Sequence, residues 1–409
     1  MYAESALQRS ALVHTSHASA HIGLSAGGMY LKTDLYASFL VHTGYVQHAG
    51  GGIKLTFPAI YNKKIYLREN SAKSIFVSVG HFPYHPLSLG MNLLTTLWTA
   101  LVLLAAPPAD TLRVMFWNLE NFFDYRDDGT STSDEEFSAR GARHWTKKRF
   151  QTKCNAIAKG VLWAGSEDGG LPDAIGFAEV ENAFVLRRLV QTTALRKLDY
   201  RIVHFDSPDP RGIDVALFYR PSRLLLADAK PCHLYQKDSI MRTRDILLAR
   251  FHTVDGADIA FLVNHHPSKY GGVEESEPRR RAAVERLAFL ADSLRREGVE
   301  NIVAMGDFND TPDNPVYGLL EPFLVNLGLP LHQKGEGTIK YDGAWELIDL
   351  CFVSPPLGDA SAMIILQLPF LMTKDTGHAG TKPLRTYSGP RYLGGVSDHC
   401  PIWLNLYRP

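Results

Sequence analysis

Polar residues at the end of one apolar run offer the clearest chemistry in this chain. The run over residues 302 to 305 leads directly into Asp307 and Asn309, within the segment VAMGDFND. Side chains two residues apart in an extended strand point to the same side, so we expect this carboxylate and this amide to converge. The carboxylate can accept a proton from water while the amide holds the water or the substrate. A turn stabilised by local hydrogen bonds would have the same sequence.

Two earlier apolar runs also end in residues that carry oxygen ligands. The segment VMFWNLENFFD ends its run at Asn118 and Glu120, and AIGFAEVEN ends its run at Glu179, with Glu181 two residues later. Carboxylate and amide oxygens suit Mg²⁺ or Mn²⁺, with Ca²⁺ as a further option, whereas zinc prefers His and Cys. These strand ends therefore predict a divalent-metal site, although Glu181 also fits the N-terminal acid of a following helix.

Three further segments supply histidines and a buried aspartate. FLVNHHPSKYGG ends a run in His265 and His266, GGVSDHCPIWLNL places Asp398 and His399 before a run, and ELIDLCFVS encloses Asp349 in one. An interior aspartate needs a strong partner. We predict that His399 is this partner, and that the pair stabilises a phosphoryl oxyanion or protonates a leaving oxygen.

Basic residues near these segments are candidates for phosphate binding. Arg211 lies in DPRGIDVALFY, Arg244 precedes an apolar run, and Lys269 follows the two histidines. Arginine can bind phosphate oxygens through its forked guanidinium group. A solvated surface position would explain the arginines equally well.

Alternating strand-like and helix-like segments must position these residues. They continue from Thr111 onward without a long linker, which predicts one domain over residues 110 to 409. Helices are predicted at residues 146 to 163 and 277 to 296, each with an apolar stripe and a solvated basic face. Long loops at residues 124 to 144 and 372 to 396 are expected to be functional. Strands are predicted at residues 112–118, 174–180, 202–205, 213–219, 247–253, 259–264, 301–306, 347–353, 362–368 and 401–407.

The first part of the chain differs from the rest in composition. Residues 1 to 90 hold seven of the 16 histidines and only three Asp or Glu. The run MNLLTTLWTALVLLAAPPAD, which begins at Met91, resembles a secretory signal peptide, although no basic region precedes its apolar stretch. That stretch is shorter than the roughly 20 apolar residues of a transmembrane helix.

These features predict three segments. We expect residues 1 to 90 to be unstructured or an over-extended reading frame, residues 91 to 109 to be a signal peptide, and residues 110 to 409 to be the catalytic domain. The protein would then be secreted or periplasmic, without a transmembrane anchor, and monomeric. A genuine N-terminal extension is the alternative.

Charge and cysteine content narrow the classes of partner. The chain has 43 Lys plus Arg and 43 Asp plus Glu, so any affinity for phosphate must be local rather than a property of a basic surface. The four cysteines are too widely spaced to predict a zinc site or a small disulfide scaffold. Cys351 and Cys400 lie in apolar runs and are expected to be buried thiols.

The order of the motifs N-L-E, A-E-V, V-N-H, G-D-F-N, L-I-D and S-D-H resembles the endonuclease/exonuclease/phosphatase superfamily. This superfamily includes pancreatic-type deoxyribonucleases, abasic-site endonucleases, neutral sphingomyelinases and inositol polyphosphate 5-phosphatases. The resemblance spans about residues 112 to 407. It implies an α/β fold, a four-layer α/β sandwich with two mixed β-sheets face to face and helices on the outside, and a site at one end of the sheets.

The resemblance also implies the metal ligands. Glu179 matches the main ligand and Asn118 its neighbour, while Glu120 and Asp398 would lie beside the metal. The metal, Mg²⁺ or Mn²⁺ with Ca²⁺ possible, would neutralise phosphate charge and position the nucleophile.

Catalytic roles follow from the same resemblance. Asp307 would activate or orient the attacking water, and Asn309 would hold the phosphate. His399, fixed by Asp349, would stabilise the pentavalent transition state, and His265 matches the other histidine on the phosphate side.

The expected function is that of a secreted nuclease or phosphodiesterase. A phosphomonoesterase or phospholipase C-type enzyme, acting on a small phosphorylated molecule or lipid head group, is the alternative, and a non-catalytic binding module is a third. The substrate would thus be a nucleic acid, a nucleotide or a phosphorylated head group. The sequence shows no basic helix or aromatic wedge for opening a duplex, which disfavours abasic-site repair.

Overall fold

The computed structural model divides into two compact units, Met1–Ala109 and Asp110–Pro409. It describes strands between Arg9 and Val79 and, after them, residues 111–126, 132–167, 169–269, 271–358 and 361–407.

The first unit contains one seven-stranded sheet of order β3-β2-β1-β7-β6-β5-β4. Strands are thus present in a segment where the sequence showed no convincing domain, whereas the over-extended reading frame stays a prediction. The predicted signal peptide at residues 91 to 109 lies outside the described residues. The strands are β1 (Arg9–Thr15), β2 (Ala18–Ser25), β3 (Gly28–Thr33), β4 (Tyr45–Ala49), β5 (Gly52–Thr56), β6 (Lys64–Glu69) and β7 (Ile75–Val79).

Two six-stranded mixed sheets form the centre of the second unit. One has the order β10-β11-β9-β8-β27-β22, in which only β8 and β9 run parallel. Its strands are β8 (Thr111–Phe122), β9 (Ala174–Val180), β10 (Arg201–His204), β11 (Asp214–Tyr219), β22 (Ala362–Ile365) and β27 (Ile402–Tyr407).

The other sheet has the order β12-β15-β16-β17-β21-β18, with β16 and β17 parallel. Its strands are β12 (Leu224–Cys232), β15 (Ile246–Thr253), β16 (Asp258–His265), β17 (Asn301–Asp307), β18 (Val325–Asn326) and β21 (Asp349–Val353).

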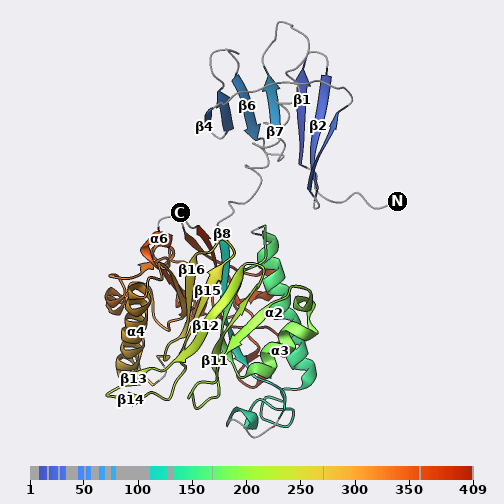
Figure 1. Cartoon of the computed structure of the whole chain (residues 1–409). Helices are drawn as coiled ribbons and strands as arrows, with labels where there is room; N and C mark the ends of the chain where they lie inside the picture. Colours follow the sequence, from blue (N-terminus) through green and yellow to red (C-terminus); the bar gives the residue numbers. More distant parts are fainter. Residues whose placement is uncertain are drawn as a thin grey trace. The chain divides into compact units, whose positions relative to one another are not determined.

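Helices cover the outer faces of both sheets, which makes four layers (Figure 1). α2 (Lys147–Glu167) and α3 (Ala183–Thr192) lie on one side, and α4 (Val273–Arg296) lies on the other. Alternate residues of β8 enter different cores: Val114 packs between the sheets, whereas Met115 packs beneath α2 and α3. The predicted four-layer α/β sandwich with two mixed sheets is confirmed.

Shorter elements connect these layers. They are η1 (Thr132–Glu135), η2 (Ala194–Lys197), η3 (Pro315–Leu319), η4 (Pro369–Leu371), α5 (Leu329–Gln333), α6 (Pro355–Gly358), and the two-stranded pairs β13 (Tyr235–Gln236) with β14 (Ser239–Ile240), β19 (Ile339–Tyr341) with β20 (Ala344–Glu346), β23 (Met372–Lys374) with β24 (Thr381–Pro383), and β25 (Tyr387–Ser388) with β26 (Arg391–Tyr392).

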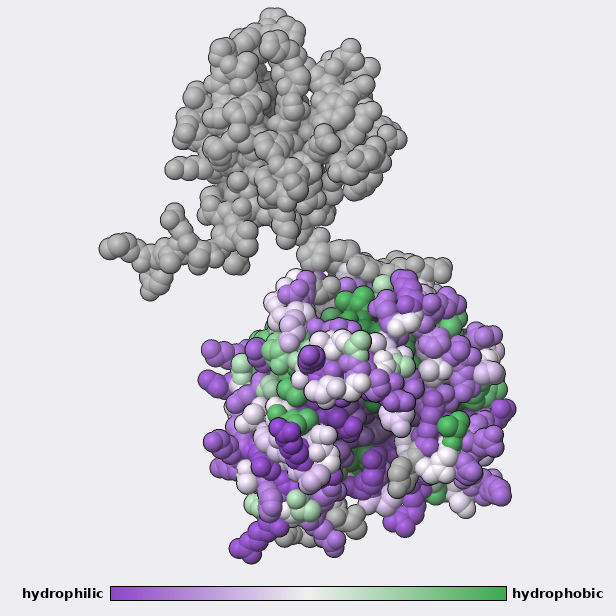
Figure 2. All heavy atoms as spheres, turned by 180° about the vertical axis from the view of Figure 1, so that it is seen from behind, coloured by the Kyte–Doolittle hydropathy of each residue, from purple (hydrophilic) through white to green (hydrophobic). Residues whose placement is uncertain are grey.

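The exposure of side chains corrects the prediction that the two long helices have solvated basic faces. The visible face of the second unit is mainly hydrophilic with scattered hydrophobic side chains (Figure 2). The basic faces of the two long helices, however, are not wholly solvated, because Lys153 and Arg280 are only 1% and 3% exposed. Of the helices described between residues 111 and 407, none combines the length and the apolar character that crossing a membrane requires.

Candidate active site

The register of the second sheet places three predicted site residues side by side. Asp307, the last residue of β17, pairs with His265 at the end of β16 and with Asp349 at the start of β21. Because β16 and β17 are parallel, their carboxyl ends meet at one edge, and the antiparallel β21 brings its first residue to that same edge.

A hydrogen bond joins the two sheets at this edge. Asn118 in β8 donates from Nδ2 to Oδ2 of Asp307 over 2.9 Å, and its Oδ1 accepts from the backbone N–H of Glu120 at 2.9 Å. Asn118 is only 1% exposed. It therefore fixes Asp307 from the opposite sheet, a position in which it can serve as an orienting residue as well as a metal neighbour.

Three of the predicted residues have left-handed backbone conformations. Glu120, Glu179 and Asn309 have φ angles of 44°, 57° and 52°. Non-glycine residues rarely adopt such angles, which cost roughly 1–3 kcal/mol each and are frequent at functional sites. In β8 and β9 the pairing register shifts between Asn118 and Phe122, where Glu120 leaves the regular ladder.

Asp307 is buried and held through both carboxylate oxygens. Oδ2 accepts from Asn118, and Oδ1 accepts from the backbone N–H of Asn309 at 2.9 Å. Burial, together with the negative charge of Asp349, raises the pKa of Asp307 to about 7, although His399 acts in the opposite direction. A carboxylate whose pKa lies near neutrality is suited to accept a proton from water.

The predicted pair of His399 and Asp349 is present. Nδ1 of His399 lies 2.7 Å from Oδ2 of Asp349, and both side chains are buried. Burial alone would lower the pKa of His399, but the Asp349 carboxylate, followed by Asp307 and Asp398, raises it well above its ordinary value. The imidazole is therefore a cation, and its Nε2 lies 3.9 Å from Oδ2 of Asp307.

His265 has the opposite electrostatic character. Its Nε2 lies 3.7 Å from Oδ2 of Asp307 and 3.9 Å from Oε1 of Glu179. Burial and the positive charges of Arg244 and Arg211 lower its pKa well below the ordinary value, so the ring is neutral. The site thus combines a charged and a neutral histidine beside one carboxylate.

His266 points elsewhere, as its alternation with His265 along the strand predicts. Its ring packs against Phe308 with centroids 4.5 Å apart, and burial lowers its pKa to about 3. Its carbonyl oxygen accepts from Nδ2 of Asn309 at 3.0 Å and from Arg244 at 2.6 Å. His266 therefore contributes through its backbone.

The acids predicted to surround the metal converge on one guanidinium group. Arg385 donates from Nε to Oε1 of Glu120 over 2.8 Å, and its Nη2 lies 3.0 Å from Oδ2 of Asp398. Burial lowers the pKa of Arg385, but the charges of Asp398, Glu120 and Glu179 outweigh burial, so the pKa is raised above its ordinary value. Sequence reasoning missed Arg385, whose only signal was its position in the loop of residues 372 to 396.

Glu120 lies deepest in this acidic group. Burial and the nearby Asp398 raise its pKa to about 7, even though Lys153 and Arg385 lower it. Lys153 donates from Nζ to the Glu120 carbonyl oxygen over 2.6 Å, and burial lowers its own pKa to about 8. Sequence reasoning missed Lys153 too, because a lysine on an amphipathic helix is ordinarily solvated.

The predicted phosphate-binding residues have different environments. Arg244 is buried and pairs with Asp209, its Nη1 atom lying 2.9 Å from Oδ2, so it stabilises the edge of the site. Arg211 is 51% exposed and is therefore accessible to a phosphate. Its positive charge also helps to lower the pKa of His265. Lys269 instead lies 3.4 Å from Asp310, and the structure gives it no direct contact with Asp307 or His399 among the residues described.

The two predicted functional loops meet beside the acids. A cavity of about 150 Å³ is lined by Glu120, by Phe137 and Arg143 from the first loop, and by Arg385 and Tyr387 from the second. This cavity therefore provides space directly beside Glu120 and Arg385.

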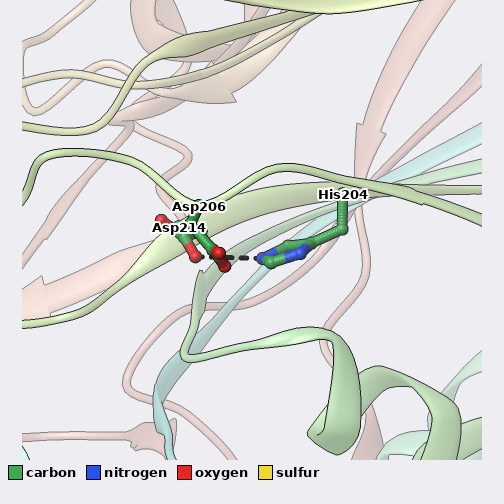
Figure 3. A group of neighbouring side chains, drawn as sticks. All are labelled: His204, Asp206 and Asp214. Carbon is green, nitrogen blue, oxygen red and sulfur yellow. Dashed lines mark hydrogen bonds and ion pairs between the residues drawn. The ribbon is translucent and has the colours of Figure 1, made fainter. Parts of the chain in front are cut away.

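A second group of His and Asp side chains lies at the start of β11 (Figure 3). His204 Nε2 lies 2.9 Å from Oδ2 of Asp214, and Asp206 approaches the same place. Asp214 also accepts from the backbone N–H of Ser207 at 2.7 Å. These bonds anchor the loop that leads to Arg211.

The donor chemistry at the sheet edge fits a divalent cation. Glu120, Glu179 and Asp398 supply three carboxylates around the single guanidinium of Arg385. Asp307, Asp349 and His399 form a further group whose atoms lie within 4.8 Å of one another, and in it only the two aspartates offer oxygen ligands, because a protonated His399 cannot bind a metal. Hard oxygen donors of this kind suit Mg²⁺, Mn²⁺ or Ca²⁺.

Three solved structures are similar to this chain. The chain resembles an endonuclease/exonuclease/phosphatase family protein from Bacteroides thetaiotaomicron (16% identity, TM-score 0.47, covering 73% of this chain and 98% of that one). It also resembles the human Nocturnin catalytic domain with bound sulfate (17% identity, TM-score 0.47, 73% and 95%). A third similar structure is Danio rerio TDP2 in complex with a single-strand DNA product (14% identity, TM-score 0.43, 72% and 98%).

The family assignment rests on the sequence itself. No curated protein sequence matches the chain significantly. The sequence profile described as the Endonuclease/Exonuclease/phosphatase family matches residues 113–408, a span that includes every residue of the site from Asn118 to His399. The protein therefore belongs to the endonuclease/exonuclease/phosphatase family.

Proposed function

We propose that this protein is a divalent-metal-dependent phosphoester hydrolase of the nuclease or phosphodiesterase type. The observation that carries the proposal is the convergence, from two sheets, of a buried carboxylate with a pKa near 7 and a histidinium held by a second aspartate. This combination would provide a proton acceptor and a positive charge, 3.9 Å apart, beside a reacting phosphorus.

Glu179, Glu120, Asp398 and Asn118 would hold the metal. When bound, the ion would neutralise phosphate charge and favour the deprotonation of water. Glu179 is anchored for this task, because its Oε2 accepts from the backbone N–H of Asn121 at 2.7 Å.

Asp307 takes the proton of the attacking water. The water oxygen forms the new bond to phosphorus while the bond from phosphorus to the leaving oxygen breaks. Asp307 accepts hydrogen bonds from Asn118 and Asn309, which fix the orientation of its carboxylate, so little reorganisation accompanies the reaction.

His399 stabilises the negative charge that develops on the phosphoryl oxygens. Its Nδ1 is committed to Asp349, which leaves Nε2 directed toward the side of Asp307 and Asp398. Preorganised cationic donors of this kind contribute about 2.7–4 kcal/mol to transition-state stabilisation.

His265, Asn309, Arg211 and Arg244 complete the phosphate side. His265 is neutral and can donate one hydrogen bond without adding a second positive charge next to His399. Arg211 is the exposed member and can contact substrate, whereas the buried Arg244 positions the carbonyl of His266 and, through it, Asn309.

A substrate panel tests this proposal. Bis-(p-nitrophenyl) phosphate, plasmid DNA and p-nitrophenyl phosphate would be assayed with Mg²⁺ or Mn²⁺ and with EDTA. We expect diester cleavage that EDTA abolishes, and loss of activity in Asp307→Ala but not in the exposed control Asp342→Asn. Faster cleavage of the monoester would favour a phosphomonoesterase, and no turnover of any phosphoester would favour a binding module.

We further propose that the protein is exported and monomeric. The proposal of export rests on the segment that begins at Met91, whereas the monomeric state is an expectation without a structural observation behind it. N-terminal sequencing of the native product should give a start near residues 107 to 111, and size-exclusion chromatography should give one chain per particle. A product that begins at Met1 would contradict export.

A further inference from the structure

Arg385 occupies an unusual position for a partly exposed arginine. Its side chain is 51% exposed, yet its Nε and Nη2 atoms contact Glu120 and Asp398, at 2.8 and 3.0 Å. These are two of the carboxylates that the proposed function assigns to the metal. A guanidinium and a divalent ion cannot both neutralise the same oxygens at full strength.

We propose that Arg385 is a built-in counter-ion which competes with the metal for Glu120 and Asp398 and which, once displaced, binds the phosphate of the substrate. The inference rests on the proposed metal-dependent function. It assigns one residue two successive partners: carboxylates in the metal-free protein and phosphate oxygens in the metal-loaded protein.

The backbone beside Arg385 is anchored independently of its side chain. The N–H of Thr386 donates to Oε2 of Glu120 over 2.8 Å, and Nζ of Lys153 donates to Oγ1 of Thr386 over 2.8 Å. The N–H of Val396 donates to the carbonyl of Leu384 over 3.0 Å. The side chain of Arg385 can therefore leave the acids while the loop stays in place.

Space for this movement exists next to the acids. The cavity of about 150 Å³ is lined by Arg385 itself, Glu120, Phe137 and Tyr387, so it lies where the displaced side chain or a substrate group would be. A guanidinium group offers a planar fork that matches two phosphate oxygens as well as it matches a carboxylate. The same guanidinium group can therefore exchange the two carboxylates for phosphate oxygens.

Metal affinity provides a test that does not depend on turnover. Mn²⁺ would be titrated calorimetrically into the full-length wild type, Arg385→Met, Arg385→Lys and Arg143→Met. We expect Arg385→Met to bind Mn²⁺ about tenfold more tightly, because the competing charge-assisted contacts to Glu120 and Asp398 are lost. The Mn²⁺ affinity of Arg385→Lys should lie between those of Arg385→Met and the wild type, because lysine keeps the positive charge but lacks the forked guanidinium group.

Arg143→Met is the matched control for a general electrostatic effect. Arg143 lines the same cavity but pairs with Glu136, so its removal should change Mn²⁺ affinity less than twofold. An equal gain in Arg143→Met, or no gain in Arg385→Met, would overturn the competition.

Phosphate binding tests the second partner. With Mn²⁺ at saturation, inorganic phosphate should bind Arg385→Met at least about fivefold more weakly than wild type, since a forked contact is lost. Unchanged phosphate affinity would overturn the transfer of Arg385 to the substrate. If the wild type bound no Mn²⁺ at all, the proposed function would fail instead, so the two failures are distinguishable.

Discussion

Replacing Asp349 by Asn removes the charge that keeps His399 protonated while it preserves the size of the side chain. The two groups lie 2.7 Å apart and are 1% and 7% exposed, so water cannot replace the lost interaction. A charge-assisted hydrogen bond is about twice as strong as a neutral one. If the histidinium stabilises the transition state, its loss should lower kcat/KM about 10²-fold to 10³-fold.

The pH dependence of this variant gives the more specific readout. In the wild type the pKa of His399 is raised well above its ordinary value of 6.5, so the imidazolium persists through neutrality. Without Asp349 that pKa falls, and the alkaline limb of the pH–rate profile should move to lower pH. The deficit should therefore be larger at pH 8.5 than at pH 6.

The assay is hydrolysis of bis-(p-nitrophenyl) phosphate at fixed Mn²⁺ between pH 5.5 and 9, with circular dichroism to verify folding. Asp342→Asn, an exposed Asp-to-Asn change, is the control. A loss below threefold together with an unmoved alkaline limb would refute the role given to the histidinium.

Three further predictions follow from the buried charges. Asp307 has a pKa of about 7 in the fold against 3.8 ordinarily, so its contribution to the free energy of unfolding falls as pH rises from about 4 to 7. Asp307→Asn should make the slope of the free energy of unfolding against pH shallower in urea titrations, while the part due to Glu120, whose pKa is also about 7, remains. The variant should stabilise the metal-free protein by about 1–3 kcal/mol at pH 8, whereas an unchanged slope would contradict the raised pKa of Asp307. Mn²⁺ at 100 times its Kd should raise the free energy of unfolding by about 2.7 kcal/mol, measured as a Tm increase that EDTA reverses and that Glu179→Gln lacks; a Tm insensitive to Mn²⁺ would argue against the metal site. Asn118→Ala should lower kcat about tenfold to 100-fold in steady-state assays because Asp307 loses its fixed orientation, and near wild-type kcat would show that this hydrogen bond is dispensable.

The sequence predicted much of the fold because continuous apolar runs mark the central strands. Residues 174 to 180 and 301 to 306 agree with β9 and β17 to within one residue. It missed β12, an edge strand in which only Leu224 and Cys232 are buried, because its short apolar start gives way to a mixed polar segment that contains a proline. It anticipated α3 only through Glu181 as an N-terminal acid and gave no bounds, because ten residues give a short periodic pattern; in the structure the N-cap is Asn182 and no acid lies in the first turn.

The site was predictable where a residue type and a strand end coincide. Asp307 met that condition, Asp349 and His399 were predicted as a buried pair, and the structure places the three together. Arg385 and Lys153 did not, because they reach Glu120 from positions 265 and 33 residues away in the sequence. Such contacts depend on loop conformation and on helix packing, which local patterns do not encode. The catalytic roles themselves stay predictions.

Parallel titrations of metal occupancy and turnover test the central claim most directly. Mn²⁺ binding would be followed by electron paramagnetic resonance while the same samples hydrolyse bis-(p-nitrophenyl) phosphate, with wild type, Glu179→Gln and the exposed control Asp342→Asn. The proposed site predicts that turnover rises in proportion to the occupancy of a Mn²⁺ site, and that Glu179→Gln loses this binding and turnover together. Turnover that persists in Glu179→Gln, or that is complete before the site fills, would contradict the account.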